Sequence, residues 1–317
     1  MYNEEVKMRF VSHYTTSIHT ERFCHSLFNS IEKYEQEWGA DLCTKDANEL
    51  QSVFDGLVGL RAKSKQMKLI ILKEYVKWCL SQDIPGACDG MLKISNTGFE
   101  SVKYQTVANP LHLQHYLNAV FAPESDKTVD NIYRCFYWLA YGGVAEEDIF
   151  DIKCSDVDLL NMVVKYKNTE IIIYREAIQA FKNCVSLTRF LYKHPNYDKL
   201  VYKDRADGDT LIRGIRGCPS VKAMRTELSR RSKTKIEEGK TDLKMSYFRV
   251  WLSGLFYRTY EAERAGIPVD FTVAAKQFME GRQYKLDSGR NTQEAKMRQL
   301  AKDYQTDYER WKNNFSI

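Results

Sequence analysis

Residues 141–159, YGGVAEEDIFDIKCSDVDL, contain the pattern on which the fold prediction rests. The glycine pair favours the end of a helix, because glycine readily adopts the left-handed backbone conformation found at helix C-termini. The acidic residues that follow suit the first turn of a short helix, predicted from about Ala145 to Asp151. Ser155 to Asp158 then lead into a strand. The stretch therefore predicts a helix, a glycine turn, a second helix and the entry to a small sheet.

The strongest β signal in the chain follows directly. Residues 162–174, MVVKYKNTEIIIY, hold two β-branched runs, 162–167 and 170–174, which predict a hairpin that turns at Asn168-Thr169. Apolar residues at helical spacing dominate most of the remainder. Helices are predicted over 18–38, from Thr44 to Leu57 or Leu60, from Ser64 to Leu80, and over 110–121, 128–141, 176–192, 219–236 and 245–262, with two more near the C-terminus and a short strand at 200–202. The expected fold class is mainly α with a small β-sheet.

Length and composition predict two domains. A chain of 317 residues with 44% apolar and 13% aromatic residues can bury a core in each of two domains. Ile84-Pro85-Gly86 ends the Ser64 helix, and no sustained period follows until Asn109-Pro110 begins the next one. We therefore expect a helical domain over residues 1–100 and a second domain over residues 106–317.

The sequence pattern argues against several classes of protein. The N-terminal segment is charged and no run of about eighteen apolar residues occurs, so neither a signal peptide nor a membrane span is expected. We expect a cytoplasmic protein with reduced, mostly buried thiols, because its eight cysteines lack any metal-binding spacing. His112 and His115 are three residues apart without a third ligand nearby in the sequence, so no metal and no cofactor are predicted.

Positive charge is concentrated in two blocks. The whole chain has a net charge of +5. Residues 61–77 carry six basic and one acidic side chain, and residues 222–249 carry nine basic and four acidic side chains. Positive patches on a nearly neutral body favour a polyanionic partner, and a solvated lysine-rich face is the alternative.

The order of these elements resembles the tyrosine recombinase (phage integrase) family. Residues 139–159 are similar to the segment in which that family carries its first catalytic arginine. The matching positions are the glycine Gly143, the apolar Val144, the acidic Asp148 and the strand entry Ser155 to Asp158. The resemblance implies a helical, SAM-like core-binding domain over residues 1–100 and an integrase catalytic-like domain over residues 106–317. The chain is most similar to the catalytically degenerate, integrase-like lysogeny repressors of SPβ-like phages.

The resemblance also identifies where the catalytic groups of the family would stand. In that family a tyrosine attacks a DNA phosphate, while two arginines, a lysine and histidines neutralise the developing charge. The corresponding positions are Ala145 for the first arginine, Lys167 for the hairpin lysine, Ser246 for the first histidine, Arg249 for the second arginine and Arg282 for the later histidine. No tyrosine lies at the expected distance beyond Arg282. The resemblance therefore implies an inactive catalytic domain.

Two other hypotheses remain open. An active but divergent recombinase could use Tyr304 or Tyr308 as nucleophile together with Lys167 and Arg249. The aromatic residues at 304, 308, 311 and 315 follow helical spacing, which instead favours a packing role for a C-terminal helix. The other hypothesis is a helical protein-interaction module that does not bind DNA.

The main hypothesis is a sequence-specific repressor that binds duplex DNA between its two domains. Phosphate contacts are expected from both basic blocks, and base readout from either the Ser64 helix or the helix over 219–236. The expected DNA-binding residues are Lys63, Lys65, Lys68, Arg225, Arg230, Arg231, Lys233, Lys235, Tyr247 and Arg249. The expected partner is a double-stranded DNA operator in the nucleoid of a bacterial host. The resemblance adds a phage regulatory peptide or protein as effector, and a homo-oligomer formed through the C-terminal helix stays open.

Overall fold

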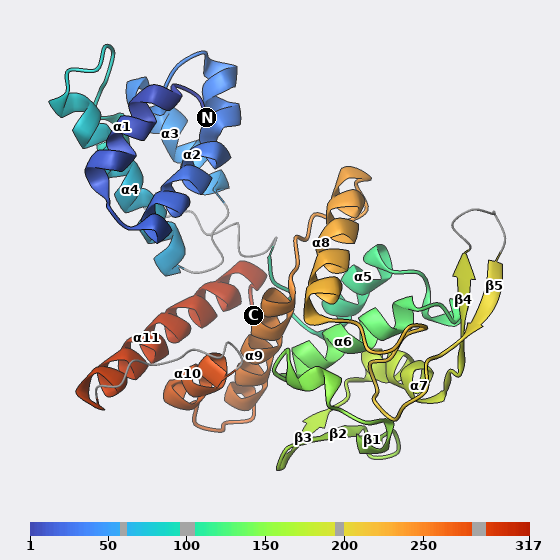
Figure 1. Ribbon diagram of the computed structural model, residues 1–317. Coiled ribbons are helices and arrows are strands. Elements are labelled where there is room, and N and C mark those ends of the chain that lie inside the picture. Colours follow the sequence, from blue (N-terminus) through green and yellow to red (C-terminus); the bar gives the residue numbers. More distant parts are fainter. Residues whose placement is uncertain (58–61, 96–104, 194–199, 281–289) are drawn as a thin grey trace. The chain divides into compact units, whose positions relative to one another are not determined.

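The computed structural model describes residues 1–57, 62–95, 105–193, 200–280 and 290–317. The chain divides into two compact units, Met1–Val102 and Lys103–Ile317, and the division falls inside segment 96–104, which lies outside the described residues. Figure 1 shows a first unit made of helices and a second unit in which helices accompany two small sheets. The fold is mainly α with a small β content, which confirms the expected fold class.

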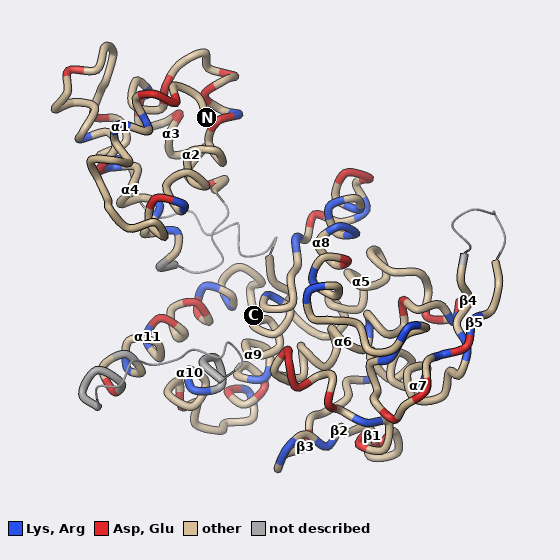
Figure 2. Tube along the Cα trace, viewed as in Figure 1, with Lys and Arg blue, Asp and Glu red and all other residues tan. Residues whose placement is uncertain are grey.

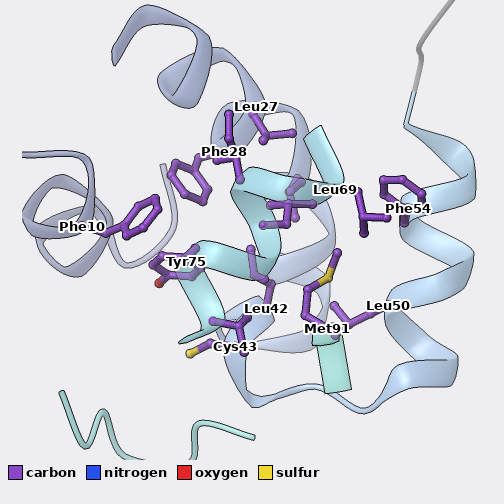
Figure 3. Close-up of a cluster of buried hydrophobic side chains, with 14 of the residues drawn as sticks. Phe10, Leu27, Phe28, Leu42, Cys43, Leu50, Phe54, Leu69, Tyr75 and Met91 are labelled. Atoms are coloured by element: carbon purple, nitrogen blue, oxygen red, sulfur yellow. The ribbon is translucent and has the colours of Figure 1, made fainter. Parts of the chain in front are cut away.

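The described part of the first unit is built around four α-helices. They are α1 (Glu4–Tyr14), α2 (Ile18–Trp38), α3 (Ala47–Gly56) and α4 (Ala62–Ser81), with short 3-10 turns at Leu42–Thr44 and Gly90–Lys93. Phe10 of α1, Phe28 of α2 and Tyr75 of α4 lie with ring centroids 5.1–6.1 Å apart. Figure 3 shows these three side chains together in the core. Aromatic contacts of this kind stabilise a core beyond the area that they bury.

Helix α1 is an element that the apolar spacing did not predict. Its buried face includes Lys7, whose side chain is fully buried with Nζ 2.5 Å from Glu35 Oε2. Nζ also donates to the carbonyl of Tyr2 at 2.9 Å. A lysine on the core side breaks the apolar pattern of a helix, and its burial is tolerable because these partners compensate its charge and satisfy its hydrogen bonds.

Helix α4 has part of its expected apolar stripe in the core. The apolar spacing of this helix predicts a buried stripe of Met67, Ile70, Ile71, Tyr75 and Trp78. The last three are buried, whereas Met67 and Ile70 are 45% and 41% exposed, and Leu69 and Leu72 are buried in addition. The N-terminal boundaries of α3 and α4 also differ from the prediction: Asp46 caps α3 in place of Thr44, and α4 begins at Ala62, before Ser64.

The second unit holds the remaining elements. Its described helices are α5 (Pro110–Val120), α6 (Asp130–Gly142), α7 (Ile178–Ser186), α8 (Val221–Glu237), α9 (Tyr247–Arg264), α10 (Phe271–Glu280) and α11 (Arg290–Phe315), with 3-10 turns η4 (Glu124–Asp126), η5 (Asp148–Phe150), η6 (Cys154–Asp156) and η7 (Arg175–Ala177). Asn109 caps α5 by accepting a hydrogen bond from the His112 amide, and Pro110 occupies the first turn as expected. The segment predicted as a helix over 145–151 forms only the short turn η5, so that prediction is wrong.

The three-stranded sheet confirms the β signal. Strands β1 (Val157–Asp158), β2 (Val163–Tyr166) and β3 (Thr169–Ile172) pair antiparallel in the order β1-β2-β3. Tyr166 pairs with Thr169, so the hairpin loop is Lys167-Asn168, one residue before the expected turn. Lys167 takes the left-handed conformation with φ 53°, which a two-residue hairpin loop favours.

A second hairpin replaces the end of a predicted helix. Helix α7 ends at Ser186, and residues 189–193 form strand β4 (Arg189–Lys193), which pairs antiparallel with β5 (Leu200–Asp204). The prediction of a helix to 192 is therefore wrong. The apolar and aromatic residues of RFLYK suit a strand as well as a helix, and the distant β5 decides between them.

Helices α6 and α9 pack closely against each other in the second unit. Gly254 of α9 lies directly against the C-terminal end of α6, where a Cβ atom would overlap the carbonyl of Tyr141. Arg258 of α9 donates to the same carbonyl. The bond satisfies one of the carbonyl groups that the end of a helix leaves without an intrahelical partner.

Helix α11 packs on its own unit, as its aromatic spacing predicted. Tyr304, Tyr308 and Trp311 are 2%, 1% and 0% exposed. All three rings contact Phe256 of α9, and Tyr304 and Tyr308 also contact Phe271 at the start of α10. The indole of Trp311 donates to the carbonyl of Val107 at 3.1 Å, which joins the helix to the start of the unit.

None of the helices in the described ranges combines the length and the apolar character that a bilayer crossing needs. All eight cysteines are free thiols, and five of them are buried.

We predict that Gly254→Ala lowers the free energy of unfolding of the second unit by about 1–3 kcal/mol, because the added methyl group overpacks the α6–α9 contact. Urea denaturation followed by tryptophan fluorescence measures the change. Gly214→Ala in the same unit is the control, since its nearest heavy atom would lie 3.6 Å from the new Cβ. Equal midpoints for the two variants would contradict the prediction.

Candidate functional site

A cleft of about 1720 Å³ lies within the second unit. Its lining comes from the glycine turn after α6, from η5, from the β2–β3 hairpin, from α8 and from α9 with the residues just before it. Four positions assigned by the resemblance line it together: Ala145, Lys167, Ser246 and Arg249. The fifth, Arg282, lies outside the described residues.

The glycine turn sets the position of Ala145. Gly143 has φ 103° and ends α6, a conformation that residues with a side chain rarely adopt. Trp251 of α9 donates to the carbonyl of Gly143 at 3.2 Å, and the buried Tyr247 donates to that of Val144. Ala145 therefore reaches the cleft with a methyl group, at a place where the resemblance implies a guanidinium.

Lys167 pairs with a carboxylate of η5 in the cleft. Its Nζ lies 2.8 Å from Asp148 Oδ2, and the hydroxyl of Tyr166 donates to the same oxygen. Partial burial acts to raise the pKa of Asp148, but the hydrogen bonds from Lys167 and Tyr166 outweigh it and lower that pKa below 3.8. The Ala145 amide also donates to the Tyr166 hydroxyl, at 3.5 Å.

Arg225 of α8 is bound to a buried carboxylate in the same cleft. Its Nε donates to Glu146 Oε1 at 2.6 Å, and its Nη2 donates to Glu146 Oε2. The Glu146 side chain is only 7% exposed, whereas that of Arg225 is 63% exposed. The bidentate hydrogen bond to Glu146 raises the pKa of Arg225 and joins α8 to the turn that follows α6.

Ser246 and Arg249 stand at the start of α9. The Ser246 hydroxyl accepts a hydrogen bond from the Arg249 amide at 3.4 Å and so caps the helix. Arg249 is half-buried, and its guanidinium donates to the carbonyl of Lys244. A serine hydroxyl can cap the helix, but it cannot shuttle protons near neutral pH as an imidazole does.

The basic residues of α8 differ in how firmly they are held. Arg231 is half-buried, 2.7 Å from Asp130 Oδ2, and lies over the rings of Phe121 and Tyr133. Arg230 is 63% exposed and pairs with Glu227 of its own helix. Lys233 lies 3.8 Å from Glu237 and Lys235 lies 2.7 Å from Glu238. Arg231 therefore serves the packing of the unit, whereas Arg230 and Lys233 face solvent.

The basic residues of α4 are less exposed to solvent than the sequence indicated. The expectation that Lys65 faces solvent is wrong: its side chain is fully buried, its Nζ donates to the carbonyl of Asp55 at 3.3 Å and it lies 5.0 Å from the ring of Phe54. Lys68 is half-buried, and burial lowers its pKa. The side chain of Lys63 lies outside the described residues.

The two candidate nucleophiles lie in the packed C-terminal core. The Tyr304 hydroxyl is 2.9 Å from Thr259 Oγ1, and the Tyr308 hydroxyl donates to Glu263 at 2.6 Å. Burial raises the pKa of both tyrosines, and for Tyr308 the Glu263 carboxylate adds to the shift. Neither tyrosine contributes to the cleft lining.

Among the described residues, no group of three or more His, Cys, Asp and Glu side chains is arranged to hold a metal ion. His112 instead accepts a hydrogen bond from the Ala108 amide at 3.3 Å. Sequence reasoning did not assign Lys244 or Arg258 to the site, although both line the cleft. The nine basic residues of 222–249 were a signal for Lys244, whereas Arg258 stood in an aromatic helix with no such signal.

Residues 1–82, which contain α1 to α4, match the family model described as MrpR, N-terminal core-binding domain. No curated protein matches the chain. Among solved structures, the chain is similar to XerA recombinase, with 14% identity, a TM-score of 0.39, and coverage of 93% of this chain and 98% of that one. The Tn1549 transposon integrase in complex with a circular intermediate DNA has 13% identity, a TM-score of 0.36 and coverage of 93% and 98%. The integrase from mycobacterium phage Brujita has 12% identity, a TM-score of 0.32 and coverage of 98% and 91%.

We predict that the Arg225–Glu146 pair has a coupling energy of about 1 kcal/mol, because the bidentate bond is charge-assisted but Arg225 is largely solvated. A double-mutant cycle with Glu146→Gln and Arg225→Gln measures it by urea denaturation. The matched control is the pair Arg298–Glu294 on α11, where both side chains are at least 80% exposed and the closest approach is 3.7 Å. The control should show no measurable coupling, and an equal value in both cycles would contradict the prediction.

We predict that Asp148→Asn lowers stability at neutral pH and that the difference from the parent protein disappears in acid. The Asp148 pKa is depressed in the folded chain, so its ionised form contributes stability above the ordinary value of 3.8. This contribution is lost as the pH falls below 3.8 and through the lower pKa of the folded state. Urea denaturation of both proteins across this range checks the prediction, which parallel pH profiles would refute.

Proposed function

We propose that this protein is a sequence-specific DNA-binding transcriptional repressor, built on a tyrosine recombinase fold that no longer cleaves DNA. Support for DNA binding comes from residues 1–82, which match a model for a core-binding domain, and from the basic block over residues 222–249 in the second unit. Lysine and arginine side chains on a solvated helix are the groups that contact DNA phosphates.

The residues at the catalytic positions of the cleft carry the proposal that cleavage is lost. Strand cleavage by a tyrosine requires preorganised cations around the phosphate, and removing one such donor costs on the order of 10² to 10³ in rate. Ala145 contributes no cation, and Ser246 contributes no imidazole. Tyr304 and Tyr308 are buried in the C-terminal core and do not line the cleft.

The regulatory role extends the proposal. A protein that binds DNA without cleaving it can block transcription by occupying an operator. By its resemblance to integrase-like lysogeny repressors, the chain would maintain a prophage in the nucleoid of its host. A phage peptide or protein effector would relieve the repression.

We predict salt-dependent binding without cleavage. Fluorescence anisotropy with labelled duplex fragments should show that affinity falls by about 10³ or more between 50 and 200 mM salt, as expected for several phosphate contacts. A nicked suicide duplex, which traps a tyrosine–phosphate bond, should give no covalent adduct with the parent protein. Ala145→Arg should give none either, because Ser246 and the position of the tyrosines are unchanged.

Two outcomes would contradict this function in different ways. A covalent adduct that disappears in Tyr304→Phe or Tyr308→Phe would identify an active, divergent recombinase. Absence of binding at low salt, or binding that does not depend on salt, would favour a helical module that interacts with proteins.

A further inference from the structure

We propose that Cys43 and Cys79 form a disulfide in the folded protein when hydrogen peroxide reaches them, so that the core of the first unit contains an oxidation site. The inference goes beyond the proposed function and does not rest on it. Three features support it: the contact between the two thiols, the charged network beside them, and the exposed loop that is bound to both cysteines.

Cys43 and Cys79 come from two elements of the first unit. Cys43 lies in the 3-10 turn η1 (Leu42–Thr44), and Cys79 lies near the end of α4. They are 1% and 0% exposed, and a hydrogen bond joins their thiols. Two sulfur atoms in such contact need only a small movement to form a bond, whereas cysteines with distant Cα atoms cannot be joined without backbone movement.

A buried network of charged and polar groups adjoins the pair. Figure 2 shows acidic and basic residues along the chain of the first unit, and three of these charges are buried next to one another, those of Lys7, Glu35 and Asp41. Asp41 Oδ1 accepts a hydrogen bond from the Cys43 amide at 3.0 Å. Asp41 Oδ2 accepts one from the Tyr75 hydroxyl at 2.9 Å and lies 3.9 Å from Lys7 Nζ. Cys43 and Tyr75 both belong to the buried cluster drawn in Figure 3.

The network makes the two thiols unequal. The hydrogen bond from Cys43 lowers the pKa of Cys79, and the Tyr75 hydroxyl and the Lys7 ammonium act in the same direction, against burial and Asp41. The same hydrogen bond, together with burial and the Asp41 carboxylate, raises the pKa of Cys43. Because the thiolate is the nucleophile in thiol chemistry, Cys79 is the sulfur that attacks the oxidant, and Cys43 supplies the second thiol.

An exposed loop is bound to both cysteines. It follows α4 over residues 82–89, most of which are exposed. The Ile84 amide donates to the carbonyl of Cys79 at 3.1 Å, and the Cys88 amide donates to the carbonyl of Cys43 at 2.8 Å. Local opening of an exposed loop costs less free energy than global unfolding. A small neutral molecule such as hydrogen peroxide can therefore reach the thiols while the unit stays folded.

The reaction balances with hydrogen peroxide as the oxidant. The Cys79 thiolate attacks one peroxide oxygen, the O–O bond breaks, and the products are a sulfenic acid and, with one proton, water. The Cys43 thiol then attacks the Cys79 sulfur, forms the S–S bond, and gives its proton to the departing hydroxide, which leaves as a second water. The two thiols lose two electrons and two protons, and the peroxide is reduced to two molecules of water.

A second pair of hydrogen-bonded thiols provides an internal control. Cys135 of α6 and Cys184 of α7 are both fully buried, and a hydrogen bond joins them. The Cys184 thiol donates to the carbonyl of Asn131 at 3.3 Å, and burial raises the pKa of Cys135 well above its usual value. Because burial favours the unreactive thiol form of Cys135, we expect this pair to stay reduced under conditions that oxidise Cys43 and Cys79.

The test uses the whole 317-residue chain with Cys218→Ser as the parent, since the exposed Cys218 would otherwise join two molecules. The reduced, folded protein is treated with a graded series of hydrogen peroxide. Remaining thiols are then blocked with N-ethylmaleimide in denaturant, and peptides are mapped by mass spectrometry without reduction. We expect a linked peptide that joins Cys43 to Cys79, is lighter by two hydrogen atoms than its two parts, and is split by dithiothreitol.

The variants separate this link from its alternatives. The linked peptide should be lost in Cys43→Ala and in Cys79→Ala, and it should persist in Cys88→Ala. Alanine keeps these sites apolar, as a buried thiol does, and the unfolding midpoint of each reduced variant shows whether it folds. If a variant does not fold, the peptide map of the parent still tests the inference.

Three results would overturn the inference. They are the absence of a link between Cys43 and Cys79, a link from Cys43 to Cys88 in its place, and oxidation of the Cys135–Cys184 pair at the same peroxide concentration. None of them bears on DNA binding, which the anisotropy measurements test separately.

Discussion

The close packing of α9 on the end of α6 is the constraint from which the second unit is built. Gly254 admits the carbonyl of Tyr141, and Arg258 binds that carbonyl. Nearer the N-terminal end of α9, Trp251 and Tyr247 donate hydrogen bonds to the carbonyls of the turn that follows α6. One face of α9 therefore holds both the end of α6 and the glycine turn that leads into the cleft.

The charged residues of the cleft form ion pairs that connect the segments around it. The buried carboxylate of Glu146 requires a cation and obtains one from α8, and the half-buried carboxylate of Asp148 pairs with Lys167 of the hairpin. These pairs connect three segments that are distant in sequence. The Arg225–Glu146 pair also joins α8 to the turn that follows α6.

The main helices and the β hairpin could be predicted from the sequence because their patterns are local. Helix α2 has the predicted bounds, Ile18–Trp38, and β2 and β3 follow β-branched runs. The predictions that were wrong or missing depend on contacts between distant segments. Helix α1 buries Lys7, a residue that reads as solvent-exposed until Glu35 is placed beside it, and β4 forms because β5 pairs with it. In α4 the sequence pattern favoured Met67 and Ile70 for the core, whereas the neighbouring elements bury Leu69 and Leu72.

The candidate site, like the fold, could be predicted only in part from the sequence. The sequence by itself determined that Ala145, Lys167, Ser246 and Arg249 stand at four of the positions that the resemblance assigns to catalytic groups. It also determined that two blocks of the chain are basic. Only the tertiary structure decided that these four positions line one cleft, and that Glu146 and Asp148 form ion pairs with its Arg225 and Lys167. It also decided that Lys65 is buried and that Arg231 is paired with Asp130, while Arg230 and Lys233 face solvent. The reason is physical: residue type sets the charge of a side chain, but the partners that neutralise or bury the charge come from other segments, which only the folded chain brings together.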